Sequence, residues 1–247
     1  MGWWLGSVDY ERHNEEAAEV WRAHREGRPV RVPVAVYGSI RNLFQNPEIN
    51  DTGYTFADFF HDPEAQIRCQ LAYQRWCRYN VLCDNEMGPP KDGWPLVVDF
   101  QNSYDAGWFG CPLVCRGNDV PDTIPILREE KLRLYDLEPP DPLYGGLMAR
   151  AVEFQEYMTD RCRDLEFEGK PVLPPRTLPG EGQDGPLEAA FKLRGVGETL
   201  VDMVDDPGYF HDLMEFVTES LIGRIKAIRR RRWARYPESP DAGEFRQ

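Results

Sequence analysis

The sequence predicts an α/β protein built on parallel strands. Short apolar runs alternate with longer amphipathic segments along the 247 residues, which is the pattern of strands connected by helices. Helix-start signals such as Asp62-Pro63 and Asp206-Pro207 precede two of the amphipathic segments. The composition, 41% hydrophobic and 29% charged, is that of a folded protein long enough for one large domain or two small ones.

The first half of the chain begins with a predicted helix over residues 8–27. The run Val30–Tyr37 places a valine at every second position, which predicts a strand. Thr55 then opens a short helix and Asp62 caps a longer one. Residues 80–83 form a short apolar run that predicts a buried strand, directly followed by polar residues.

The second half continues the alternation of extended runs and helices. Its predicted elements are, in order, a strand at 96–100, a helical turn at 104–110, extended pieces at 112–115 and 122–126 around a Gly117-Asn118 turn, a helix at 147–162 and a strand at 171–174.

A distinctive order of parts fills residues 185–228. Gly185-Pro186 predicts a turn, followed by short helices at 187–193 and 198–204. Asp206-Pro207 then starts a long helix, because the carboxylate accepts hydrogen bonds from free N–H groups and proline suits the first helical position. Its apolar residues recur at three- and four-residue steps: Phe210, Leu213, Met214, Val217, Leu221, Ile225 and Ile228.

Charge and cysteine usage restrict the partners and the location. The 42 acidic residues exceed the 29 basic ones, giving a net charge of −13, so we expect neither nucleic acid nor an anionic membrane as a partner. No apolar stretch reaches the length of a membrane span, and no signal peptide is recognisable. The six cysteines lack metal-site spacing, so no cofactor is evident and a cytoplasmic location is predicted.

Three stretches together resemble the uroporphyrinogen decarboxylase superfamily, which includes corrinoid- and zinc-dependent methyltransferases. The first is the order of parts from Gly185 to Glu219 just described. The second is the segment Tyr104–Cys111, followed by Pro121 and Ile126. The third is Asp62-Pro63-Glu64 with its helix and the strand that ends at Asp84. The resemblance covers roughly residues 30–228, and its specificity comes from the three stretches taken together.

The resemblance implies a (β/α)₈ TIM barrel, with its site at the carboxyl ends of the strands. About four strands are recognisable where the barrel has eight, so we expect the first half to two-thirds of a barrel. The expected domains are a helical extension at 1–29, the partial barrel at 30–236 and a frayed tail at 237–247. A partial barrel leaves sheet edges and apolar surface exposed, which favours a homo-oligomer or a completing subunit.

Asp84 is the candidate catalytic residue. It matches the family aspartate that hydrogen-bonds pyrrole N–H groups, where a carboxylate stabilises the cation formed before CO₂ is lost. Its alternative role is that of a turn aspartate. Glu86 is a candidate for substrate binding or a solvated loop acid.

Other candidates follow strand ends, where side chains line a barrel's cleft. Tyr37, Ser39 and Arg41 follow the first predicted strand. Asp99, Gln101 and Asn102 follow the strand at 96–100, with turn chemistry as their alternative role. Trp108 is predicted either to stack on substrate or to form part of the core.

Two departures from the family pattern decide between its branches. The decarboxylase motif R-Q-A-G-R is reduced to Arg41, and the family tyrosine falls on Phe191 or Lys192. The methyltransferase branch binds zinc through His-x-Cys and a later cysteine, located after the long helix, so zinc requires ligands from a segment outside this chain.

The favoured function is therefore that of a methyltransferase-like enzyme of this superfamily, acting on a small methylated compound or a corrinoid, with a corrinoid protein as an expected partner. A first alternative is a cofactor-free decarboxylase of a tetrapyrrole such as uroporphyrinogen. A second is a non-catalytic partial barrel that binds a ligand or a partner chain.

Overall fold

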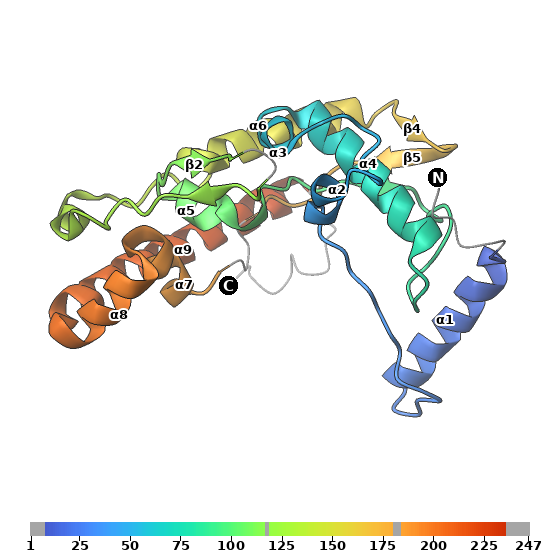
Figure 1. Ribbon diagram of the computed structural model, residues 1–247, viewed down its shortest axis with the longest axis horizontal. Coiled ribbons are helices and arrows are strands. Elements are labelled where there is room, and N and C mark those ends of the chain that lie inside the picture. Colours follow the sequence, from blue (N-terminus) through green and yellow to red (C-terminus); the bar gives the residue numbers. More distant parts are fainter. Residues whose placement is uncertain (1–7, 117–118, 180–183, 236–247) are drawn as a thin grey trace. The chain divides into compact units, whose positions relative to one another are not determined.

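The computed structural model describes residues 8–116, 119–179 and 184–235 (Figure 1). It is a helix-rich mixed α/β chain with two compact units. Unit 1 comprises Met1–Leu96 and Asp160–Pro174, and unit 2 comprises Val97–Thr159 and Pro175–Gln247. The predicted tail at 237–247 and the Gly117-Asn118 turn lie outside the described residues.

Unit 1 has four helices among the described residues, and the first, third and fourth begin close to where the sequence predicts them, whereas the second was not predicted. They are α1 (Tyr10–Arg25), α2 (Arg41–Gln45), α3 (Phe56–His61) and α4 (Pro63–Asn80). Thr55 and Asp58 form a reciprocal capping box on α3, and the Asp62 side chain accepts a hydrogen bond from Glu64 N at the start of α4. The capping predictions at Thr55 and Asp62 are confirmed.

An aromatic cluster forms part of the core of unit 1. Phe44 of α2 packs against Phe56 and Phe59 of α3, with ring centroids 4.2 and 5.4 Å apart. Phe56, Phe59 and Phe60 are fully buried, and α4 adds Ile67 and other apolar side chains from its inner face. Burying these side chains supplies the hydrophobic stabilisation of this unit.

A small three-stranded sheet completes unit 1. The central strand β5 (Lys170–Leu173) pairs in parallel with β1 (Trp94–Pro95) and antiparallel with β4 (Glu166–Phe167). Gly93 precedes β1 with φ of +128°, and a Cβ at this position would lie 2.4 Å from the Pro171 carbonyl oxygen. Only glycine permits the strands to approach this closely.

Three predicted strands are not found. Val30–Tyr37 is extended but belongs to neither of the sheets formed by the described residues. Residue 80 ends α4, and residues 81–83 form no ladder. Near 96–100, backbone pairing is limited to β1 and a hydrogen bond from Leu96 N to the Leu173 carbonyl oxygen. The apolar pattern at these positions is suitable for a strand, but a strand also needs a neighbouring backbone with which to pair. The described strands therefore do not show the predicted barrel.

Unit 2 combines a β-hairpin with helices. The hairpin pairs β2 (Leu113–Val114) with β3 (Asp122–Thr123). The helical elements before and after it are η1 (Gln101–Ser103), α5 (Tyr104–Trp108), η2 (Lys131–Asp136) and α6 (Gly146–Arg161), whose last two residues belong to unit 1.

The order of parts predicted from Gly185 onward is confirmed as three helices. They are α7 (Pro186–Arg194), α8 (Val196–Asp205) and α9 (Pro207–Arg235). Both α7 and α8 contact α9. The Asp206 carboxylate accepts a hydrogen bond from Tyr209 N at 3.2 Å, as expected of a helix cap. None of the described helices is both long and apolar enough to cross a lipid bilayer.

Candidate functional site

Asp84, the predicted catalytic residue, holds the extended segment at 30–37 against the chain that follows α4. Both of its carboxylate oxygens accept hydrogen bonds from Arg31, with Nη1 lying 2.6 Å from Oδ2 and Nη2 bonding to Oδ1. Val34 N also donates to Oδ2 at 2.7 Å, and Asp84 N donates to Val34 O at 2.7 Å. The side chain is buried.

Neighbouring contacts attach α1 to the same loop. Trp21 Nε1 donates to the Asp84 carbonyl oxygen at 2.7 Å, and Asn14 exchanges hydrogen bonds with the backbone of Met87. The hydrogen bond from Arg31, followed by that from Val34 N, lowers the pKa of Asp84 to about 2. Asp84 is therefore ionised at neutral pH, with its charge compensated by Arg31.

Four further candidates of unit 1 lie on its surface or near it. Tyr37 is 85% exposed. Ser39 Oγ accepts a hydrogen bond from Arg41 N at 3.3 Å, next to the start of α2. Glu86 receives a hydrogen bond from Arg78 Nη2 at 2.8 Å. The predicted roles of these residues in substrate binding stay predictions.

The candidate residues of unit 2 lie in a turn at residues 99–102 and, in the case of Trp108, in the buried core. The Asp99 carboxylate accepts hydrogen bonds from Gln101 N at 2.7 Å and from Gln101 Nε2 at 2.6 Å. These bonds hold Gln101 at φ of +54°, a conformation uncommon for residues other than glycine. The Asn102 carbonyl oxygen accepts from Lys192 Nζ at 2.7 Å. Trp108 is 1% exposed.

A buried ion pair that the sequence reasoning missed lies beside Trp108. Arg224 of α9 donates through Nη2 to Asp105 of α5, and both side chains are almost completely inaccessible to solvent. The Arg224 guanidinium stacks on the Trp108 ring, with Cζ 4.5 Å from its centroid. Nε and Nη1 of Arg224 have no hydrogen-bond partner. The pair therefore fixes α5 to α9.

Asp105 also receives a hydrogen bond from Asp184 N at 3.1 Å, and the Asp184 carboxylate is paired with Lys192. A sequence signal for this cluster exists. Arg224 occupies a helix position between Leu221 and Ile228, on the apolar stripe, where a charged residue indicates a buried partner.

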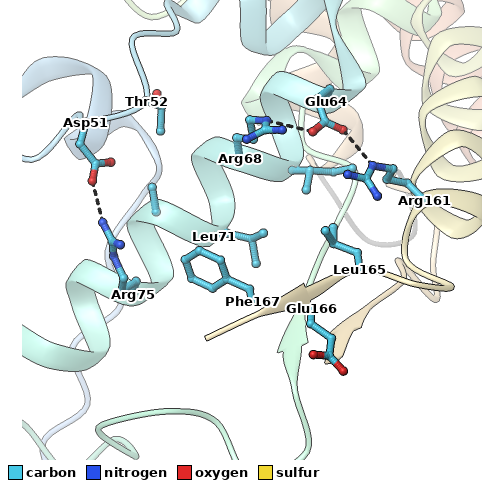
Figure 2. Close-up of a pocket in the computed structure, with 12 residues that line it drawn as sticks. Asp51, Thr52, Glu64, Arg68, Leu71, Arg75, Arg161, Leu165, Glu166 and Phe167 are labelled. Atoms are coloured by element: carbon cyan, nitrogen blue, oxygen red, sulfur yellow. Dashed lines mark hydrogen bonds and ion pairs between the residues drawn. The ribbon is translucent and has the colours of Figure 1, made fainter. Parts of the chain in front are cut away.

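A cavity of unit 1 lies between α4 and the chain around β4 (Figure 2). Its volume is about 390 Å³, within the range of ligand pockets. The apolar lining comes from Ile67, Leu71, Ala72, Leu165 and Phe167, and the guanidinium groups come from Arg68, Arg75 and Arg161. None of the predicted site residues lines this cavity.

The described residues do not form a metal centre. No group of three or more His, Cys, Asp or Glu side chains in this part of the chain could hold a metal ion. Burial raises the pKa of the Cys111 thiol to about 11, whereas zinc binds the thiolate. These residues therefore do not fit the zinc that the methyltransferase branch uses.

Comparisons with known proteins give one structural likeness. No protein-family profile and no curated protein sequence matches the chain. A methyltransferase from Methanosarcina mazei superposes with a TM-score of 0.49 and 14% sequence identity, over 83% of this chain and 52% of that protein. The chain thus spans about half the length of that protein. A likeness at this level establishes neither the barrel nor an activity.

We predict that Asp84→Asn lowers the free energy of unfolding at pH 7 by about 1–3 kcal/mol, because Arg31 and Val34 N lose a charged acceptor. The folded pKa is below the unfolded value of about 3.9. The contribution of Asp84 is therefore present above pH 4 and is lost as the pH falls towards about 2. Urea unfolding across this pH range measures both effects. Asp92→Asn, on an exposed aspartate, is the control, and an equal loss in both variants contradicts the prediction.

Asp105→Asn is expected to destabilise unit 2 by about 3–5 kcal/mol, because it leaves the Arg224 charge buried without a partner. Combining it with Arg224→Met removes that charge and restores part of the stability. Chemical unfolding of the two single variants and the double variant measures the coupling. Arg163→Gln, which breaks an exposed pair with Asp160, is the control and costs less than about 0.5 kcal/mol. Additive single effects would contradict the coupling.

Proposed function

We propose that this chain is a methyltransferase-like member of the uroporphyrinogen decarboxylase superfamily and acts on a small methylated compound or a corrinoid. The observation that carries the proposal is the arrangement of α7, α8 and α9. The Gly-Pro start, the glycine break at Gly195 and the Asp206-Pro207 junction, which carry the family resemblance, fall at the boundaries of these helices. In this proposal, β1 and β5, which pair in parallel, are strands of a partial (β/α)₈ barrel.

The state of Asp84 favours methyl transfer over decarboxylation. A decarboxylase would direct this carboxylate at the pyrrole N–H groups of its substrate and use its negative charge to stabilise a cation. Here both oxygens accept hydrogen bonds from Arg31, and the charge is already compensated. Decarboxylation would require Arg31 to leave, whereas methyl transfer places no such demand on Asp84.

We further propose a cytoplasmic location and a second protein chain as a partner, either another copy of this chain or a completing subunit. The free thiols of Cys69, Cys111 and the other described cysteines support the location. Exposed apolar side chains support the partner. On the extended segment, Val30 is 75%, Val32 77% and Tyr37 85% exposed. Such a row on an extended backbone is suited to being covered by another chain.

We expect the 247-residue chain to transfer methyl groups to or from cobalamin. Incubation of cob(I)alamin with a panel of small O-, N- and S-methyl compounds should produce methylcobalamin, measured by its absorbance, above the level without protein. Asp92→Asn, on an exposed residue, should match the unaltered chain. Conversion of uroporphyrinogen to coproporphyrinogen would instead establish the decarboxylase. No methylcobalamin with any compound would contradict methyl transfer by this chain on its own.

Self-association through the Val30–Tyr37 row is expected in sedimentation velocity as a mass above the 28.6 kDa of one chain. Val32→Lys should shift the sample towards the monomer, because it places a charge in an apolar contact. Val204→Lys is the matched control: Val204 is 79% exposed and lies on α8. A monomer at all concentrations would contradict a second copy as the partner. It would leave a different subunit for that role.

A further inference from the structure

We propose that the cavity between α4 and the β4 segment of unit 1 binds a small organic anion with an apolar or aromatic body. This site goes beyond the proposed methyl transfer and does not depend on it. It shares no residue with the Asp84 cluster or with the Asp105–Arg224 pair.

The floor of the cavity is suitable for an apolar body. Ile67, Leu71 and Ala72 line it from successive turns of α4, and Leu165 and Phe167 line it from the chain leading through β4. Figure 2 shows the Phe167 ring beside Leu71. The Arg75 guanidinium lies over the same ring, 5.9 Å from its centroid. A flat hydrocarbon group gains contact with both the aliphatic and the aromatic side chains.

One end of the cavity has an excess of positive charge. Arg68 Nε and Arg161 Nε both approach the single carboxylate of Glu64, at 2.9 and 3.5 Å from its two oxygens. Two guanidinium groups thus share one carboxylate. Glu166 also lines the cavity, but Figure 2 shows its carboxylate pointing away from this end. In a chain whose net charge is −13, this local excess indicates a preference for an anion.

The other end is electrically balanced. Arg75 Nη2 is 2.6 Å from Asp51 Oδ2, which forms a one-to-one pair. The anionic group of the ligand should therefore bind at the Arg68–Arg161 end, with its body directed along Leu71 and Phe167. Guanidinium groups bind carboxylates and phosphates through paired N–H donors, and Arg68 remains 58% exposed to make such contacts.

The probe for this site is 2-naphthoate, a flat aromatic carboxylate. Binding of 2-naphthoate and of a neutral naphthyl compound to the full chain is followed by fluorescence anisotropy, and acetate, which does not fluoresce, by its displacement of bound 2-naphthoate. The neutral 2-naphthylmethanol keeps the body without the charge, and acetate keeps the charge without the body. We expect 2-naphthoate to bind at least tenfold more tightly than either. Equal affinity for 2-naphthoate and 2-naphthylmethanol overturns the proposal, as does no detectable binding of 2-naphthoate at millimolar concentration.

Variants then place the bound probe in this cavity. Arg68→Gln and Arg161→Gln should each weaken 2-naphthoate binding by about tenfold, the usual effect of losing a charge-assisted hydrogen bond, and should not affect 2-naphthylmethanol. Ala72→Trp should prevent binding by filling the floor. Arg163→Gln is the matched control, because this exposed arginine pairs with Asp160 and does not line the cavity. Unchanged affinity in both Arg68→Gln and Arg161→Gln, with folding verified by circular dichroism, overturns the assignment.

Discussion

Buried aspartates, each bound by an arginine, connect parts of this chain that backbone pairing does not. In the described residues, the buried acids are Asp84, Asp105 and Asp202, and each is bound by an arginine. The strands are only two to four residues long, so their ladders supply few hydrogen bonds. Instead, the Asp84–Arg31 pair joins the chain after α4 to the extended segment, the Asp105–Arg224 pair joins α5 to α9, and the Arg194–Asp202 pair joins α7 to α8.

In the third pair, one arginine binds both the next helix and a segment 67 residues earlier in the sequence. Arg194, at the end of α7, donates to Asp202 of α8 at 2.7 Å and to the Leu127 carbonyl oxygen at 2.8 Å. Lys131 then bridges Asp202 and Asp206, and its hydrogen bond lowers the pKa of Asp206. Burying an unpaired carboxylate costs free energy, so few other arrangements of α7 and α8 would satisfy all of these charged groups. The helix corner that carries the family resemblance is therefore also held by buried charge.

Helix positions could be predicted from the sequence because their signals are local. Thr55, Asp62 and Asp206 each satisfy N–H groups two or three residues away, so a few residues specify the boundary. Strands depend on a distant partner. The alternation at Val30–Tyr37 specifies which side chains could face a core, but its backbone is held by Asp84 and Asn85 and not by a strand.

The bonding partners of the predicted site residues could likewise not be identified from the sequence. Asp99 and Gln101 follow an apolar run as predicted, but they bond to each other. From the sequence, Asp105 could be identified only as part of the segment Tyr104–Cys111 that resembles the family. Its partner Arg224 lies 119 residues further along the chain. Similarly, the cavity of Figure 2 combines α4 with residues near 165, and no local pattern in the sequence connects these two segments.

The partners of the cavity arginines bear on how an anion could be accommodated there. Glu64 accepts a hydrogen bond from Arg68 Nε and forms an ion pair with Arg161 Nε at 3.5 Å, and each guanidinium has five N–H donors. An incoming carboxylate can therefore bind to the remaining donors without displacing Glu64. Glu64 keeps the two guanidinium groups close together before the ligand arrives, which reduces the conformational entropy lost on binding. The same carboxylate also weakens the attraction for an anion, since only one net positive charge remains. A moderate affinity that depends on the apolar floor follows from this balance.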